Sequence, residues 1–254
     1  MIKVAESRSS SIANEMRGYD YFYQSPSSRA LQTKLIMSST TSKLPLTLCL
    51  ATVDDIPALT TLINTSVRTL HAPFYTQAEI EGSLASVYGV DTTLVKDGNY
   101  FVVTATLSLP RVGHLDPQRS LEVEDIQEET KERIVACGGW SFRSTLYGGD
   151  QLSSRNDNDL MNPETDAAKI RALFVHPDYT RMGIGGLVVD RCEEEARKRG
   201  FKRAEMGATF AGVDFYRGRG YKALMDQGAE GVEERKLGNG EVLRLVRMGK
   251  ALVE

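Results

Sequence analysis

The sequence is poor in the residues that build metal centres and disulfide frameworks. It has three cysteines and three histidines in 254 residues, and Cys49, Cys137 and Cys192 lie far apart, without the Cys-x-x-Cys or Cys/His spacing of a zinc site. Their apolar or helical surroundings indicate reduced thiols in or near a hydrophobic core, as in a cytoplasmic protein. We therefore expect no metal site and a cytoplasmic location.

Long hydrophobic runs and an excess of one charge are also missing. No apolar stretch approaches the roughly 18 residues that a membrane-spanning helix needs, so we expect no membrane association. With 31 basic and 34 acidic residues the formal net charge is -3, and no short segment gathers enough lysine and arginine to attract nucleic acid. A nucleic-acid partner is therefore not expected. A composition that is 41% hydrophobic and 26% charged is that of an ordinary globular protein.

The first 43 residues lack a sustained hydrophobic period. They are rich in serine, with scattered arginine and lysine, which predicts a disordered N-terminal tail at residues 1–43 before one folded domain at residues 44–254. Their acidic residues argue against a mitochondrial targeting peptide, and Met37 is a candidate translation start. Turn-forming and acidic residues predict two long loops in the domain, at about 108–132 and 144–167.

Within the domain, strand patterns outnumber helix patterns. Apolar and β-branched runs predict strands at residues 44–52, 99–107, 133–143, 167–177 and 203–209, and two closing strands at residues 221–226 and 241–250. Helices are expected at residues 54–70, 71–88, 183–199 and 212–220. Because the connections mix crossovers with hairpins, we expect an α/β fold in which a mixed sheet is covered by helices on both faces.

The stretch "TRMGIGGLVV" at residues 180–189 opens an amphipathic helix with three glycines. Such a turn leaves backbone N–H groups unpaired at the positive end of the helix dipole, which suits a phosphate. No GK[ST] follows, which excludes a Walker P-loop, and the GxGG spacing late in the chain fits a dinucleotide-binding fold poorly. From these residues alone, phosphate binding and close helix–sheet packing both remain open.

The segments around this turn carry a family resemblance. "LFVHPDY" before it, "RAEMGAT" after the helix and "FYRGRGY" beyond together resemble the GNAT N-acetyltransferase superfamily, over about residues 44–250. The family's turn pattern [RQ]xxGx[GA] falls on residues 180–185, where Gly183 and Gly185 match and Thr180 replaces the usual Arg or Gln. The resemblance implies a mostly antiparallel sheet splayed between two parallel strands. It also implies an enzyme that moves an acetyl group from acetyl coenzyme A, its cosubstrate, to a primary amine by direct attack.

The resemblance further implies where the cosubstrate binds. Its pyrophosphate would lie on the turn and its pantetheine arm along the preceding strand. The implied contacts are Leu173, Phe174, Val175, Arg181, Met182, Gly183, Ile184, Gly185 and Gly186. Tyr216 matches the family position that approaches the thioester sulfur, where it would protonate the departing thiolate, and a main-chain N–H near Phe174 would stabilise the oxyanion. The neighbouring Phe215 and Tyr221 are expected in the core.

The sequence identifies no general base. Lys169 stands where many family members carry a glutamate. Glu205 and Asp150 are alternatives, and each is also open to a purely structural role. A weakly basic acceptor amine would need no dedicated base.

Acceptor recognition is expected from the first helices and the second long loop. His71, Phe74 and Tyr75 lie in the segment that covers the acceptor site in the family. In the loop segment "TLYGGDQ", Tyr147 and Asp150 are candidates, and the carboxylate either meets a cationic amine or fixes its own turn.

Trp140, the only tryptophan, is open to both a substrate-binding and a core position. Long loops and the lack of a charged docking tract favour a small-molecule amine as the acceptor. A protein N-acetyltransferase and a non-catalytic acyl-coenzyme A binding module remain alternatives. The sequence also leaves open whether the chain forms a homodimer, and which acceptor and acyl chain it uses.

Overall fold

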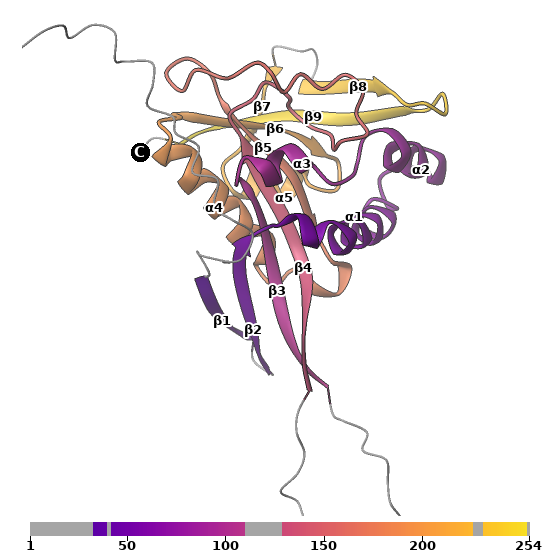
Figure 1. Cartoon of the computed structure of the whole chain (residues 1–254). Coiled ribbons are helices and arrows are strands. Elements are labelled where there is room, and N and C mark those ends of the chain that lie inside the picture. The colour runs from indigo at the N-terminus through magenta and orange to yellow at the C-terminus, as the bar shows by residue number, and fades with distance from the viewer. Residues whose placement is uncertain (1–32, 40–41, 110–128, 226–230, 253–254) are drawn as a thin grey trace, which may run out of the picture. The chain divides into compact units, whose positions relative to one another are not determined.

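A computed structural model describes residues 33–39, 42–109, 129–225 and 231–252. The described strands form one sheet in the order β1-β2-β3-β4-β5-β6-β9-β7, with β8 paired to β9 (Figure 1). The strands are β1 (Thr33–Ser39), β2 (Ser42–Leu50), β3 (Tyr100–Leu109), β4 (Glu129–Ser141), β5 (Ala168–Val175), β6 (Arg203–Thr209), β7 (Lys222–Ala223), β8 (Val232–Lys236) and β9 (Val242–Ala251). The helices are α1 (Ile56–Leu70), α2 (Gln77–Ser86), α3 (Thr92–Lys96), α4 (Ile184–Lys198) and α5 (Val213–Gly218).

Antiparallel pairing dominates this sheet. The exception is β5 with β6, which pair in parallel at Ala168 with Ala204 and Lys169 with Glu205. This register covers the start of both strands, and their later residues line a cavity instead. The mostly antiparallel sheet splayed between two parallel strands is therefore confirmed.

Helices cover both faces of the sheet, as expected. Alternate residues of β3 point to opposite faces, so Tyr100 and Val102 pack in the same core cluster as α1, whereas Phe101 and Val103 pack with α4. The start of α4 is fixed by Gly183, which has φ 76°, and the chain leaves the helix through Gly200, with φ 91°. In the described part of the chain, no helix combines the length and the apolar character needed to cross a bilayer.

All of β1, the start of β2, the end of β3 and the start of β4 lie in segments that the sequence did not assign to strands. Residues 33–39 and 42–43, expected in the tail, form the β1–β2 ladder, while residues 1–32 lie outside the described residues, where the tail stays a prediction. Likewise β4 begins at Glu129, inside the loop expected at 108–132, of which residues 110–128 are not described. Backbone pairing between strands does not require apolar side chains, so hydrophobic periodicity missed these ends. Residues 144–167 contain no helix or named strand.

Candidate active site

A cavity of about 630 Å³ opens where β5 and β6 separate. Its walls are residues 170–175 of β5, the turn before α4, residues 206–209 of β6, and α5. We call residues 180–186 its turn part. Its ring part consists of His71, Phe74, Tyr88 and Tyr147, from the region around α1 and α2 and from the loop after β4. One cavity therefore joins the glycine turn to an aromatic compartment.

β5 carries a bulge where it lines this cavity. Cys137 of β4 faces Phe174 and Gly139 faces Arg171, so β5 has one residue more than β4 between these pairs. Ala172, inside the bulge, has φ 53°, a left-handed conformation that is rare for a residue with a side chain. A bulge leaves main-chain groups outside the ladder, which is the feature expected near Phe174 for an oxyanion site.

The turn before α4 exposes backbone to the cavity. The first N–H groups of a helix have no partner within it, and Gly183, Ile184, Gly185 and Gly186 all line the cavity. A Cβ added to Gly185 would lie 3.5 Å from Phe215 Cζ, an ordinary contact that the fold itself tolerates. The glycine therefore leaves room for a group that approaches the backbone closely.

Tyr216 on α5 also lines the cavity and is 8% exposed. Burial raises the pKa of its phenol, so the hydroxyl is protonated at neutral pH and can serve as a proton donor. Its ring packs against Phe215 at 5.0 Å and Tyr221 at 5.7 Å between ring centroids. Tyr221 is core, as expected, but Phe215 is 37% exposed and lines the cavity, because α5 turns it toward the helix start at Gly185.

Comparison with known proteins agrees with this architecture. Residues 113–221 match the model of the acetyltransferase (GNAT) family. The chain carries a GNAT acetyltransferase domain. The cavity's main walls, namely residues 170–175 of β5, the turn before α4, residues 206–209 of β6 and α5, all lie within the matched residues of the GNAT domain.

A solved structure shows the same fold. A GCN5-related N-acetyltransferase from Rhodopseudomonas palustris aligns with a TM-score of 0.50 and 19% identity, over 85% of this chain and 98% of that chain. The PaiA N-acetyltransferase from Thermoplasma acidophilum, solved in complex with coenzyme A, aligns with a TM-score of 0.43 and 11% identity, over 81% of this chain and 98% of that chain. No curated protein matches the sequence.

Most residues singled out from the sequence lie on the cavity of the GNAT domain. They are His71, Phe74, Tyr147, Leu173, Phe174, Val175, Arg181, Gly183, Ile184, Gly185, Gly186 and Tyr216. Four others are not among its lining residues: Tyr75, Trp140, Asp150 and Met182. The first three of these have structural contacts instead.

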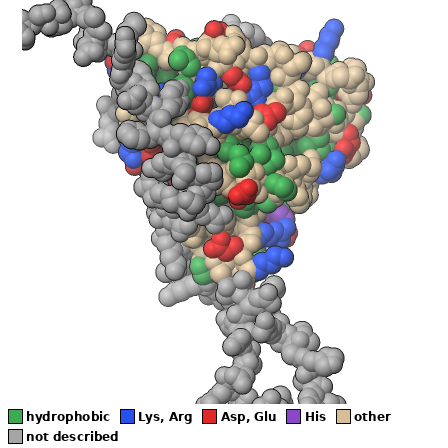
Figure 2. Space-filling view, in the orientation of Figure 1, with side chains coloured by type: hydrophobic (Ala, Val, Ile, Leu, Met, Phe, Trp, Pro, Cys, Tyr) green, Lys and Arg blue, Asp and Glu red, His purple; other side chains and the backbone are tan. Residues whose placement is uncertain are grey.

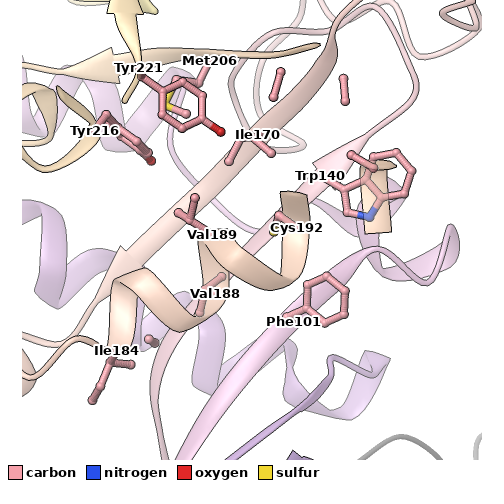
Figure 3. Close-up of a cluster of buried hydrophobic side chains, with 14 of the residues drawn as sticks. Phe101, Trp140, Ile170, Ile184, Val188, Val189, Cys192, Met206, Tyr216 and Tyr221 are labelled. Atoms are coloured by element: carbon pink, nitrogen blue, oxygen red, sulfur yellow. The ribbon is translucent and has the colours of Figure 1, made fainter. Parts of the chain in front are cut away.

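Trp140 is a core residue. It is 2% exposed, and its ring centroid lies 6.1 Å from that of Phe142 and 6.0 Å from that of Phe201. Figure 3 shows it on the other side of the hydrophobic cluster from Tyr216. Residue 140 of β4 therefore packs in the core beside α4 and does not line the cavity.

Tyr75 and Asp150 form hydrogen bonds that hold loop segments in place. The Tyr75 hydroxyl donates to the carbonyl of Arg244 at 2.7 Å and accepts from the N–H of Phe210 at 2.9 Å, which ties the segment between α1 and α2 to β9 and to the end of β6. The Asp150 carboxylate accepts from the N–H of Thr92 at 3.1 Å and from Arg155 at 2.9 Å. Both side chains therefore hold loops in place around the cavity.

Glu205 is not available as a base for this cavity. Its carboxylate is bound by Lys169 and, at 2.8 Å, by Arg247. Although burial opposes ionisation, these hydrogen bonds lower the pKa of Glu205. The three side chains line a separate polar pocket of about 380 Å³. Lys169, where the family often has glutamate, is thus an ion-pair partner.

Tyr88 and Arg171 are among the cavity residues that sequence reasoning missed. Tyr88 is 7% exposed and lies at 5.5 Å from His71 and 6.0 Å from Phe174 between ring centroids. The Arg171 side chain is fully buried, forms a 2.6 Å ion pair with Asp91 and donates to the carbonyl of Gly148 at 2.7 Å. An arginine inside the apolar run "KIRALFV" is a signal that could have been used, whereas nothing in the sequence marks Tyr88.

Proposed function

We propose that this GNAT domain transfers an acetyl group from acetyl coenzyme A to a primary amine of a small molecule by direct attack. The observation that carries the proposal is the continuous cavity, which runs from the α4 turn through the gap between β5 and β6 to the ring part. A long acyl-carrying arm needs such a slot, and a small acceptor fits an enclosed aromatic compartment.

The residues present fit a coenzyme A. Its pyrophosphate would accept hydrogen bonds from the N–H groups of residues 183–186, at the positive end of the α4 dipole. The space that a Cβ at Gly185 would fill is available to these phosphates. The pantetheine amides would pair with main-chain groups of the bulged β5, in the manner of an added strand.

The same walls supply the chemistry of acetyl transfer. A main-chain N–H near Phe174 stabilises the oxyanion as the amine attacks, and Tyr216 donates a proton as the C–S bond breaks. Direct attack is favoured because burial raises the pKa of Cys137 to about 12 and also raises that of Cys192, which leaves neither thiol ionised to form an acetyl-enzyme. The free, buried cysteines also support the cytoplasmic location that we propose.

Coenzyme A release, followed with a thiol reagent, tests the proposal. The full-length protein receives acetyl coenzyme A and a panel of amines, amino acids and peptides. We expect amine-dependent release, and a kcat that is roughly 100-fold lower in Tyr216→Phe with unchanged acetyl coenzyme A affinity. Lack of acetyl coenzyme A binding would contradict the proposal. Binding without release for any acceptor would favour the non-catalytic module.

A further inference from the structure

The ring part of the cavity adjoins the proposed reaction centre. The ring of Tyr88 makes edge contacts with both His71, on the side of α1, and Phe174, on the bulged strand. Phe74 is 52% exposed, and Tyr147 packs over Gly207 of β6. Hydrophobic side chains are also exposed among charged ones on the face shown in Figure 2. An acceptor entering this compartment meets aromatic surfaces and comes close to the acyl carbon that Phe174 would hold.

The hydroxyl of Tyr88 is the polar group of this compartment that lacks a partner. Its oxygen is buried and forms no hydrogen bond within the described structure. Buried hydroxyls in proteins almost always have a hydrogen-bond partner, and a hydroxyl can both donate and accept. Tyr88 lines the cavity while its hydroxyl oxygen lies just below the surface, so a bound molecule can supply that partner once the side chain shifts toward it.

Charge at the ring part does not favour an ammonium ion. Among the described residues that line the cavity, only Asp214 on α5 has a carboxylate. Its side chain is 94% exposed and pairs with Arg217. The buried guanidinium of Arg171 donates to the carbonyl of Gly148 and is paired with Asp91, which does not line the cavity. His71 carries no charge at neutral pH, since burial lowers its pKa to about 4. An ammonium ion would lose its hydration here without meeting a carboxylate.

We propose that the acceptor is an aromatic amine of low basicity, which binds uncharged with its ring against His71 and Phe74 and its nitrogen at the Tyr88 hydroxyl. This inference rests on the proposed acetyl transfer. The nitrogen lone pair forms the N–C bond, the C–S bond breaks, and its electron pair leaves with sulfur. The nitrogen loses one proton and the sulfur gains one, so an amide and free coenzyme A are the products. An amine that enters neutral explains a site without a carboxylate base.

A pair of matched amines tests the substrate class. Aniline and cyclohexylamine have one six-membered ring and one primary amine each, but aniline is uncharged at neutral pH. With the full-length protein and saturating acetyl coenzyme A at pH 7, we expect kcat/KM for aniline to exceed that for cyclohexylamine at least about tenfold. From pH 6 to 8 the value for cyclohexylamine should rise with its neutral fraction, whereas that for aniline stays flat.

The outcomes separate this inference from the proposed function. Equal or faster acetylation of cyclohexylamine at pH 7 would overturn the substrate class and leave acetyl transfer standing. Acetyl coenzyme A binding with no acetylation of either amine would also overturn the substrate class. Failure to bind acetyl coenzyme A, measured by calorimetry, would overturn the proposed function itself.

Tyr88→Phe tests the role of the hydroxyl. We expect kcat/KM for aniline to fall about tenfold, with unchanged acetyl coenzyme A affinity and an unchanged or higher Tm, because a buried unpaired hydroxyl is removed. Tyr100→Phe is the matched control: Tyr100 is also buried, but its hydroxyl donates to Cys137 Sγ at 3.3 Å and it does not line the cavity. Full kcat/KM in Tyr88→Phe would show that the hydroxyl does not bind the amine.

Discussion

Two glycines near the α4 start have different reasons for lacking a side chain. At Gly185 a Cβ would lie 3.5 Å from both Phe215 Cζ and Val175 Cγ2, which the fold tolerates. We therefore expect Gly185→Ala to keep its Tm. Its methyl group would occupy the space proposed for the phosphates, so the Kd for acetyl coenzyme A should rise at least about tenfold, as calorimetry would measure.

Gly138 serves as the contrasting variant. A Cβ there would lie 2.7 Å from Val188 Cγ1 and 3.0 Å from Leu173 Cδ1, so α4 and the bulge of β5 would have to move. We expect Gly138→Ala to lose about 1–3 kcal/mol of unfolding free energy through overpacking. If Gly185→Ala binds acetyl coenzyme A as tightly as the wild type, the phosphates do not bind at this turn.

His71 gives the protein a pH-dependent stability. Burial lowers its pKa from 6.5 to about 4 in the folded state, so the unfolded chain binds a proton first as the pH falls. This contribution is complete above pH 6.5 and is lost between pH 6.5 and 4, at most about 3 kcal/mol. Urea denaturation of His71→Gln should show a flatter stability profile in that window than the wild type. Parallel profiles would show that His71 titrates normally.

At the scale of one element, the bulge of β5 depends on a left-handed residue. Ala172 has φ 53°, which a β-branched side chain adopts at a much higher cost than alanine or glycine. We expect Ala172→Val to lower the unfolding free energy by about 1–2 kcal/mol, and Ala172→Gly to change it little. Equal stability of both variants in urea would mean that the strand does not bulge at this residue.

Elements with strong local signals were predictable from the sequence. The helix α4 has a glycine at each end and an apolar stripe, and β6 was placed at its observed bounds. The signals fail for α3, which is a single turn, and for β8, whose "VEERK" has too few apolar residues to alternate. β8 exists because β9 offers it a backbone partner, and pairing of that kind cannot be read from local composition.

The turn part of the cavity was predictable from the sequence, and the ring part was less so. The turn part is contiguous in sequence, so its glycines and the later Tyr216 were identified together. The ring part is assembled from α1, the end of α2 and a loop some 60 residues later, and no local pattern links Tyr88 to Phe174. Tyr75, named from its place in a segment, and Trp140, which the sequence left open, have structural contacts instead of lining the cavity.

At the scale of the whole domain, a buried charge network connects parts that are distant in sequence. Asp91, at the start of α3, binds Arg171 of β5 at 2.6 Å and Arg155 of the 144–167 loop at 2.8 Å, and Arg155 also binds Asp157 at 2.6 Å. The side chains of Asp91 and Arg171 are both 0% exposed. This network holds the long loop against the strand that lines the cavity, so loop position and sheet stability are coupled through it.

Removing one charge of this network should therefore destabilise the whole domain. Asp91→Asn keeps an oxygen for the N–H of Leu94 but removes the 2.6 Å partner of the buried Arg171 cation, whose other carboxylate, Asp157, is 3.8 Å away, and this should lower the unfolding free energy by roughly 3–5 kcal/mol. Limited proteolysis should then cut the 144–167 loop faster than in the wild type. Glu81→Gln is the control, because its 2.8 Å pair with Arg68 is half exposed and screened by water, so its loss should leave Tm and cleavage unchanged. Equal stability of the two variants would show that Arg171 finds solvent or another carboxylate, and that the loop is held by its packing instead.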